Sequence, residues 1–137
     1  MYNKIIVTMA LDHGIGAASM EVARTLLNEG GEIIALHVYE APSGSVGAYL
    51  DEDVVKAAFE KSKAEMDARV KDLRNVRAVV VKGHSGRTII DVAAEKSADC
   101  IVIGSHKPGL LDYLLGSTAA RVVRHAPCAV HVLRSAS

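Results

Sequence analysis

The sequence predicts an α/β protein in which a doubly wound sheet of five parallel strands lies between two layers of helices. Short runs rich in Val and Ile alternate along the chain with longer segments whose apolar residues repeat at helical spacing. These short runs are apolar at most positions, which is typical of strands covered on both faces. With 137 residues, 50% of them hydrophobic, the chain is expected to form one domain over residues 1–137.

The strands are predicted from runs that are too short for helices and are bounded by polar or turn-forming residues. The expected strands are Lys4–Ala10, Glu32–Tyr39, Val76–Lys82, Asp99–Gly104 and Cys128–Arg134. Cys100 and Cys128 fall in this apolar strand sequence, and they are therefore expected to be buried, reduced thiols. Zinc needs more ligands at closer spacing than these two residues provide, so no metal site is assigned.

Helical periodicity fills the intervals between the strands. The expected helices are Ile15–Asn28, Asp51–Arg74, a segment from the Gly83–Gly86 turn to Lys96, and Ser117–His125. Gly30-Gly31 is expected to stop the first helix, because glycine readily adopts the left-handed conformation that ends helices. The second helix has an acidic first turn, which suits the helix dipole, and Ser85 is expected to cap the third helix. Residues 40–50 are rich in Gly, Pro and Ser and predict a loop.

This alternation requires right-handed crossovers and predicts a three-layer fold with strand order 3-2-1-4-5, similar to flavodoxin-like and Rossmann-like folds. In such sheets, ligands bind at the carboxyl ends of the strands, where the strand order reverses. That switch point lies between the first and fourth strands. The loops that follow these two strands, residues 10–16 and 104–117, are therefore the candidate binding loops.

The loop after the fourth strand carries features that suit an anion. Gly104 ends the strand, and Gly116 directly precedes a helix that begins Ser117-Thr118. Small residues let backbone N–H groups approach a phosphate, the helix N-terminus adds partial positive charge, and the two hydroxyls add donors. Lys107 adds a mobile cation to this loop. The plain structural alternative is that Gly104 only turns the chain and Ser117 only caps the helix.

The loop after the first strand offers one carboxylate, Asp12, placed to accept hydrogen bonds from a ribose or to approach a metal. Its alternative role is that of a turn residue or a helix cap. The next residues, Gly14-Ile15-Gly16, resemble the start of a dinucleotide-binding motif, but the third glycine is missing. His13, His84 and His106 all follow strand ends and are candidates to converge on the same pocket.

Composition excludes several classes of function. Lys plus Arg and Asp plus Glu number 16 each, so the chain has no global positive field to hold nucleic acid. Aromatic residues make up only 4%, which disfavours a face that stacks single-stranded bases. No apolar run is long enough to insert into a membrane. The N-terminus carries no signal peptide, so a cytoplasmic protein is expected.

No catalytic residue is assigned from the sequence. A phosphoryl receiver would need an acceptor Asp at the end of the third strand, where the chain reads Lys82-Gly83-His84-Ser85. Ser105 lacks the elbow motif of an α/β-hydrolase, and a P-loop is absent. No group stands out that would orient an attacking water, so the energetics favour binding over turnover.

The C-terminal part of the chain contains a longer signature. It runs from Gly104-Ser-His-Lys-Pro-Gly109 through Gly116-Ser-Thr to Cys128-Ala-Val-His-Val-Leu-Arg134, and it resembles the signature of the universal stress protein family. Asp12 after the first strand and Leu36-His37-Val38 in the second strand fit the same family. Small members of that family are single-domain α/β proteins, usually dimers, and many bind ATP. The resemblance therefore implies ATP as the ligand, with Mg²⁺ as a candidate companion ion.

The family's nucleotide-binding pattern is G-2x-G-9x-G-(S/T), and Gly104 and Gly116-Ser117 correspond to its first glycine and its final pair, although the stretch between them is one residue shorter. Lys107 stands in the place of the second glycine, so a side-chain charge replaces a backbone donor there. By position, the resemblance implies that Ala10 and Val38 line the adenine and that Ile103 and Gly104 floor the pocket. The remaining implied ligand contacts are Asp12 toward ribose or metal, His106 and Lys107 in the loop, and Gly109, Gly116, Ser117 and Thr118 at the phosphates.

Three functions remain open from the sequence. The leading hypothesis is a cytoplasmic, ATP-binding regulatory module of the stress response. The second is an interaction domain that binds no nucleotide and acts through its dimer surfaces. The third is an enzyme, such as a slow ATPase or phosphotransferase.

The last predicted strand favours self-association. Residues 129–133 are apolar on both faces, yet the strand order places them at the edge of the sheet. A bare apolar edge is an aggregation hazard unless it is paired or covered. A homodimer through this strand is the expected arrangement, with a tetramer as an alternative.

Overall fold

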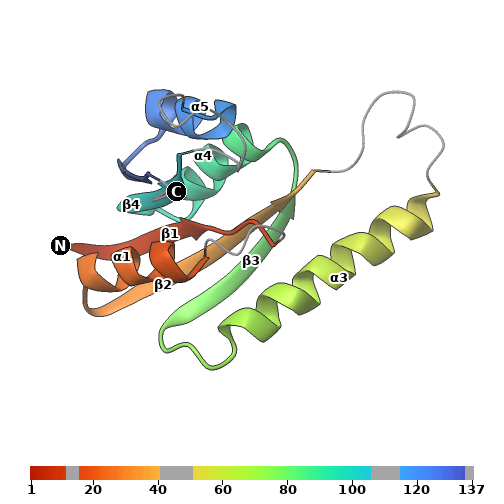
Figure 1. Ribbon diagram of the computed structural model, residues 1–137, viewed down its shortest axis with the longest axis horizontal. Coiled ribbons are helices and arrows are strands. Elements are labelled where there is room, and N and C mark those ends of the chain that lie inside the picture. Colours follow the sequence, from red (N-terminus) through yellow and green to blue (C-terminus); the bar gives the residue numbers. More distant parts are fainter. Residues whose placement is uncertain (12–15, 41–50, 106–114, 135–137) are drawn as a thin grey trace.

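The computed structural model describes residues 1–11, 16–40, 51–105 and 115–134 of the chain (Figure 1). They form a five-stranded sheet in the order β3-β2-β1-β4-β5, and neighbouring strands are parallel. The strands are β1 Tyr2–Thr8, β2 Leu27–Tyr39, β3 Val76–Lys82, β4 Cys100–Gly104 and β5 Ala129–Leu133. The predicted fold class and strand order are therefore confirmed.

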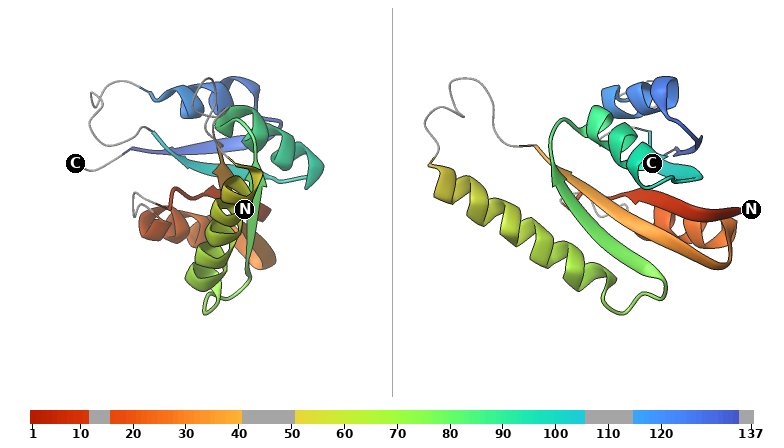
Figure 2. Two further views of the ribbon diagram at one scale, coloured as in Figure 1. Left: turned by 90° about the vertical axis from the view of Figure 1, so that its right-hand side faces the viewer. Right: turned by 180° about the vertical axis from the view of Figure 1, so that it is seen from behind.

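Helices cover both faces of the sheet. They are α1 Gly16–Leu26, α3 Glu52–Val70, α4 Ser85–Glu95 and α5 Ser117–His125. The helices α1 and α3 lie on one face and α4 and α5 on the other (Figures 1 and 2). Among the described helices, none is long and apolar enough to cross a membrane.

Successive residues of the central strand β1 enter opposite layers of the core. Ile6 packs with Ile34 and Ile101 in the layer under α4 and α5. Ile5 and Val7 pack in the layer under α1. All five side chains have no exposed surface, which explains why the strand sequence is apolar without alternation.

The junction between α1 and β2 differs from the prediction. The helix was expected to run to Asn28 and stop at Gly30-Gly31, but it ends at Leu26, and pairing with β1 begins at Leu27. Gly30 has a φ of +80°, and a Cβ on Gly31 would lie 2.8 Å from a backbone carbonyl oxygen of β1. The two glycines therefore allow an irregularity in the β1–β2 pairing rather than a helix end.

The predicted cap of α4 is also wrong. The helix begins at Ser85, so His84 is its N-cap residue, and the His84 side chain makes no capping hydrogen bond. Instead, the N–H and the hydroxyl of Ser85 both donate to one carboxylate oxygen of Glu40, at 2.7 and 2.8 Å. The cap comes from the end of β2, 45 residues earlier in the chain, which local sequence spacing does not reveal.

At the opposite end of the sheet, Asp99 bonds to the start of β1. One carboxylate oxygen accepts from the backbone N–H groups of Asn3 and Lys4, at 2.9 and 3.0 Å. The N–H of Asp99 in turn donates to the carbonyl of Lys4 at 2.8 Å. The Lys4 ammonium donates to the carbonyl of Lys96, at the end of α4, at 2.9 Å. These bonds hold the start of β1 against the segment that leads into β4.

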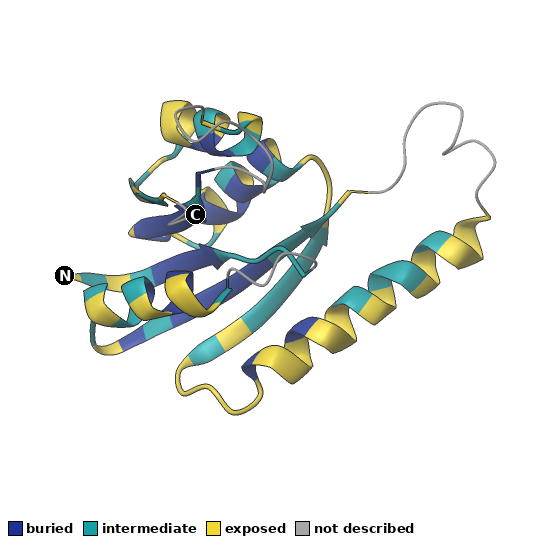
Figure 3. Ribbon diagram, viewed as in Figure 1, coloured by how far each residue is buried: buried dark blue, intermediate teal, exposed yellow. Residues whose placement is uncertain are grey.

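Most of α3 is exposed along its length (Figure 3). Its buried residues are Met66 and Val70, both near the C-terminal end, and the helix stops at Val70 rather than at the predicted Arg74. Nearer its start, the Phe59 ring meets Tyr39 edge-on at 6.1 Å, and Lys82 lies 4.9 Å from the ring centre. The attachment of α3 to the sheet therefore depends on few side chains.

Both cysteines are free thiols, as predicted, and Cys100 is buried, but Cys128 is half-buried rather than buried as expected. They belong to different layers, because Cys100 packs under α1 and Cys128 packs against the opposite cluster. Burial is the main cause that raises the pKa of each thiol, and the neighbouring Cys128 raises the pKa of Cys100 further.

Replacing Asp99 by Ala is expected to lower the free energy of unfolding by about 1–3 kcal/mol, because two backbone N–H groups lose a charged acceptor. Asp99→Asn retains one acceptor oxygen and should fall between the parent and Asp99→Ala. The matched control is Asp91→Ala, which breaks an exposed ion pair with Arg87 and should cost about 0.5 kcal/mol or less. Urea denaturation measures the free energy of unfolding of all three variants. Equal losses for Asp99→Ala and Asp91→Ala would contradict a stabilising role of the hydrogen bonds to Asp99.

The raised thiol pKa values predict a pH dependence of stability. The folded chain holds the thiol protons more tightly than the unfolded chain, whose thiols titrate near 9.0. Their contribution is therefore constant below pH 9 and declines as pH rises through the pKa values of the folded thiols. The difference in unfolding free energy between the parent and a Cys100→Ala/Cys128→Ala variant should shift against the parent above pH 9. A pH-independent difference would argue against thiol burial as the cause.

Candidate functional site

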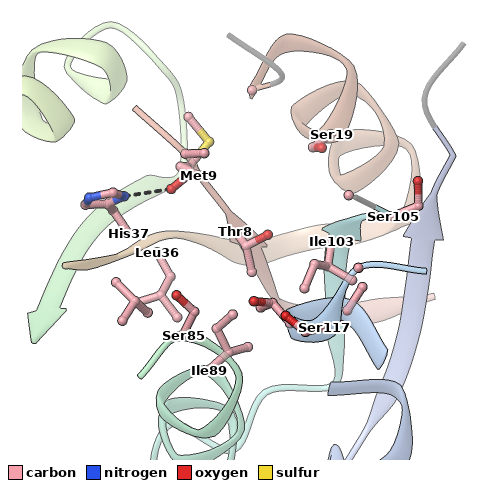
Figure 4. Close-up of a pocket in the computed structure, with 17 residues that line it drawn as sticks. Thr8, Met9, Ser19, Leu36, His37, Ser85, Ile89, Ile103, Ser105 and Ser117 are labelled. Atoms are coloured by element: carbon pink, nitrogen blue, oxygen red, sulfur yellow. Dashed lines mark hydrogen bonds between the residues drawn. The ribbon is translucent and has the colours of Figure 1, made fainter. Parts of the chain in front are cut away.

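A cavity of about 330 Å³ opens at the carboxyl ends of β1, β2 and β4 (Figure 4). It lies at the switch point between β1 and β4, where the sequence places the binding loops. The described residues predicted for the site that line this cavity are Ala10, Val38, Ile103, Gly104, Gly116, Ser117 and Thr118. Asp12, His106, Lys107 and Gly109 lie outside the described residues.

One part of the cavity is apolar. Leu36 and Val38 come from β2, Ile89 from α4 and Ile103 from β4. These side chains surround the space from three different elements, which Figure 4 shows for Leu36, Ile89 and Ile103. A slot of this kind suits a flat apolar group such as a heterocyclic base.

The other part contains the N-terminus of α5. The N-cap residue Gly116 donates its N–H to the carbonyl of Ser105 at 2.6 Å and accepts from Ala120 at 2.9 Å. Within the part of the chain that the structure describes, no side chain caps the helix, and its first three residues all line the cavity. The N–H groups in that first turn have no acceptor within the helix, so they can serve an anion in the cavity.

Ser105 supplies a polar group that the sequence did not single out as a ligand contact. The residue is 1% exposed and lines the cavity, and its hydroxyl has no hydrogen-bond partner in the part of the chain that the structure describes. Its backbone is fixed on both sides, since its N–H donates to Leu133 at 3.0 Å and its carbonyl accepts from Gly116. A buried hydroxyl without a partner is costly, and a ligand in the cavity would relieve that cost.

Gly104 has neither a positive φ nor a crowded Cα. Positive φ values among the described glycines occur at Gly30 and Gly83, and a Cβ built on Gly104 meets no atom within 4 Å. The alternative in which this glycine serves only to turn the chain therefore has no support in the backbone. The space that a side chain would take at Gly104 belongs to the cavity.

The segment after β1 is held by side chains from two other elements. The N–H of Met9 donates to the carbonyl of Leu36 at 2.8 Å. The carbonyl of Met9 lies 2.8 Å from Nδ1 of His37, and the dashed line in Figure 4 marks this bond. The carbonyl of Leu11 accepts from the guanidinium of Arg69 on α3 at 2.6 Å. The sequence did not predict either of these side-chain contacts.

The two helices that begin at the cavity differ in charge at their N-termini. Ser85, the first residue of α4, lines the cavity, and its N–H and hydroxyl are taken by the Glu40 carboxylate. The N-cap residue of α5 is Gly116, which has no side chain, and no carboxylate of residues 1–11, 16–40, 51–105 or 115–134 is found capping this helix. Of the two positive helix ends, α4 is already occupied by an anion of the chain itself, and α5 is available to a ligand.

The histidines that follow strand ends do not form a described metal site. His84 is the N-cap of α4 and is not among the cavity residues, while His13 and His106 lie outside the described residues. Across residues 1–11, 16–40, 51–105 and 115–134, no group of three His, Cys, Asp or Glu side chains is placed to hold a metal ion.

Comparisons with known proteins agree with this architecture. The chain is 30% identical over 139 aligned positions to universal stress protein A homolog 2 of Coxiella burnetii, covering 97% of this chain and 95% of the relative. It is 41% identical to a universal stress protein of Methanothermobacter thermautotrophicus over 59 residues, which span 43% of this chain and 40% of that protein.

Solved structures share the fold at low sequence identity. Universal stress protein UspA from Lactobacillus plantarum superposes with a TM-score of 0.77 at 24% identity, covering 97% of this chain and 98% of that one. A universal stress protein solved in complex with cAMP gives a TM-score of 0.63 at 18% identity, with 98% of both chains covered. One from Archaeoglobus fulgidus in complex with dAMP gives 0.56 at 24% identity, covering 96% of this chain and 97% of that one.

The family assignment follows from the extent of the match. The sequence model of the universal stress protein family matches residues 1–134, nearly the whole chain. The resemblance in the glycine-rich signature and the strand order observed in the structure agree with it. The chain belongs to the universal stress protein family.

Proposed function

We propose that this chain binds ATP in the cavity between β1 and β4 and acts as a cytoplasmic, nucleotide-dependent regulatory module. The observation that carries the proposal is the union, in one cavity, of an apolar slot and an uncapped helix N-terminus. A nucleotide needs both environments, because its base is flat and largely apolar while its phosphates are anionic.

The base is placed at the apolar end. Val38 and Leu36 of β2 and Ile103 of β4 offer packing surface. Ala10, two residues after the end of β1, also lines the cavity with a small side chain. Burial of a base here would remove apolar surface from water, at roughly 25 cal/mol per Å².

The phosphates are placed at α5. The free N–H groups of its first turn, the hydroxyls of Ser117 and Thr118, and the unpartnered hydroxyl of Ser105 supply donors. Gly104 leaves room for the ligand beside them. Lys107 and Asp12 remain sequence-based candidates, for a charge on the phosphates and for a ribose or Mg²⁺ contact.

The orientation of the nucleotide follows from the two helix ends. A phosphate at α4 would meet the Glu40 carboxylate, whereas a phosphate at α5 would meet uncapped N–H groups. Adenosine toward β2 and phosphates toward α5 is therefore the favoured arrangement. Adenine nucleotides as the ligand class are supported by the family members solved with cAMP and dAMP.

We also propose that the protein is a homodimer through β5. This strand is the edge of the sheet, and Ala129 and His131 on it are exposed. The carbonyl of Leu133 accepts from Ser105, the residue that follows β4, so Leu133, His131 and Ala129 direct their backbone groups toward β4. Those of Val130 and Val132 then face the open edge, where a second copy could pair.

Gly104→Ala is expected to weaken ATP binding by about tenfold or more, about 1.4 kcal/mol, because the added methyl enters the cavity. The thermal midpoint of the free protein should stay level or rise, since the φ at this position is not positive and the methyl meets no atom of the described residues. Isothermal titration calorimetry and thermal unfolding on the same samples separate the two effects.

Gly30→Ala is the matched control. Its added methyl also meets open space, but φ is +80°, so stability should fall while ATP affinity stays that of the parent. If Gly104→Ala binds ATP as tightly as the parent, or the parent binds no ATP, the proposed site is wrong.

Val130→Pro is expected to shift the protein from dimer to monomer, because proline removes an N–H from the open edge of β5. The bonds of β5 to β4 are spared, since the inward donors belong to its alternate residues. Light scattering at micromolar concentration reads the outcome, and ATP titration serves as the control for folding. A parent protein that is already monomeric there would refute the dimer.

A further inference from the structure

We propose that His37 and Arg69 are positioning residues that hold the segment Met9–Leu11 as a wall of the nucleotide cavity, and that Arg69 thereby couples nucleotide affinity to the attachment of α3. This inference rests on the proposed function. Arg69 is not among the residues that line the nucleotide cavity and acts through the Leu11 carbonyl, whereas His37 lines that cavity and also holds the Met9 carbonyl.

The wall needs support from outside the sheet. β1 ends at Thr8, and beyond it Met9 makes the last backbone bond to β2, through its N–H to Leu36. Met9 and Ala10 both line the cavity, so a shift of this segment changes the shape of the base end directly. Beyond the end of β1, the carbonyls of Met9 and Leu11 are bonded by side chains, those of His37 and Arg69, instead of by backbone groups of a neighbouring strand.

His37 is the first of these supports. A carbonyl oxygen only accepts hydrogen bonds, so the Nδ1 that faces Met9 at 2.8 Å carries the proton. The bond is therefore made by the Nδ1–H form of the neutral ring and by the charged ring alike. His37 sits next to Val38 on β2, so the wall is tied to the strand that forms the apolar slot.

Arg69 is the second support, and it comes from a distant element. It lies 58 residues beyond Leu11, on the last turn of α3 beside Val70, and donates to the Leu11 carbonyl at 2.6 Å. Besides the buried Met66 and Val70 and the contact of Phe59 with Tyr39, the bond from Arg69 to Leu11 is a further tie between α3 and the rest of the molecule.

A second cavity, of about 470 Å³, lies on the other side of the wall segment. It opens between α1 and α3, and both Arg69 and Met9 line it. Met9 and Gly16 line both cavities, so the start of the wall segment lies between the two spaces. A nucleotide that holds Met9–Leu11 in place strengthens the acceptor of Arg69, and by reciprocity an intact Arg69 bond strengthens nucleotide binding.

The test compares Arg69→Met and Arg69→Lys with Arg77→Met in the full chain. Arg77, on β3, is also exposed and pairs with Glu32 of β2 at 3.4 Å. Its replacement therefore removes a cation but leaves the segment Met9–Leu11 intact. Titrations with ATP and with AMP should show that Arg69→Met weakens both by the same factor, on the order of fivefold to tenfold. Arg69→Lys should recover part of the affinity, and Arg77→Met should match the parent.

A loss confined to ATP would mean that Arg69 attracts phosphates through its charge, which would overturn the inference. Equal affinity of the parent and Arg69→Met for both nucleotides would overturn it as well, while leaving the proposed function standing. A parent that binds neither nucleotide would refute the proposed function and this inference together.

Hydrogen exchange, compared with and without ATP in each variant, separates the coupling from a loss of overall stability. Saturating ATP should slow exchange of the amides of the last turn of α3 in the parent and in Arg77→Met, but not in Arg69→Met. A double-mutant cycle adds His37→Leu, which removes the first support. Since both side chains act on one segment, the double variant should lose less affinity than the product of the single losses. Protection of α3 that survives in Arg69→Met would contradict the coupling.

Discussion

The structure depends on one constraint: β1 must be buried on both faces. Its neighbours β2 and β4 flank it, and its side chains enter the α1 layer and the α4–α5 layer in turn. Asp99 fixes its start, and its end is released at Thr8, in the middle of the molecule. That release creates the cavity, because the strand stops where the flanking helices α4 and α5 begin. The site is thus a consequence of how the central strand ends.

Elements that are set by local pattern were predicted from the sequence with their bounds. Val76–Lys82 and Ser117–His125 appear in the structure as predicted, because a short apolar run and a strong helical stripe decide them. The end of α1 and the cap of α4 were not predicted, because contacts with residues distant in the sequence determine them. Pairing with β1 begins at Leu27, and a carboxylate from the end of β2 replaces the local cap of Ser85.

The same division holds for the cavity. Glycines and hydroxyls at the switch point were predictable, since residue type and strand order locate them without coordinates. The burial of the Ser105 hydroxyl, the reach of Arg69 to Leu11 and the choice of Nδ1 on His37 depend on packing between elements far apart in the sequence. No spacing in the chain encodes these contacts. Asp12, His106, Lys107 and Gly109 stay predictions from the sequence.

The Glu40 carboxylate on α4 has a consequence for which molecules the cavity admits. It accepts two hydrogen bonds from Ser85, a residue that lines the cavity at the start of α4, while the start of α5 also lines the cavity. A molecule with negative charge at a single terminus satisfies both ends at once. A molecule with negative charge at both termini must set one of them against Glu40, or displace it from Ser85. Under the proposed function, this arrangement would favour a mononucleotide over a molecule that carries negative charge at both ends.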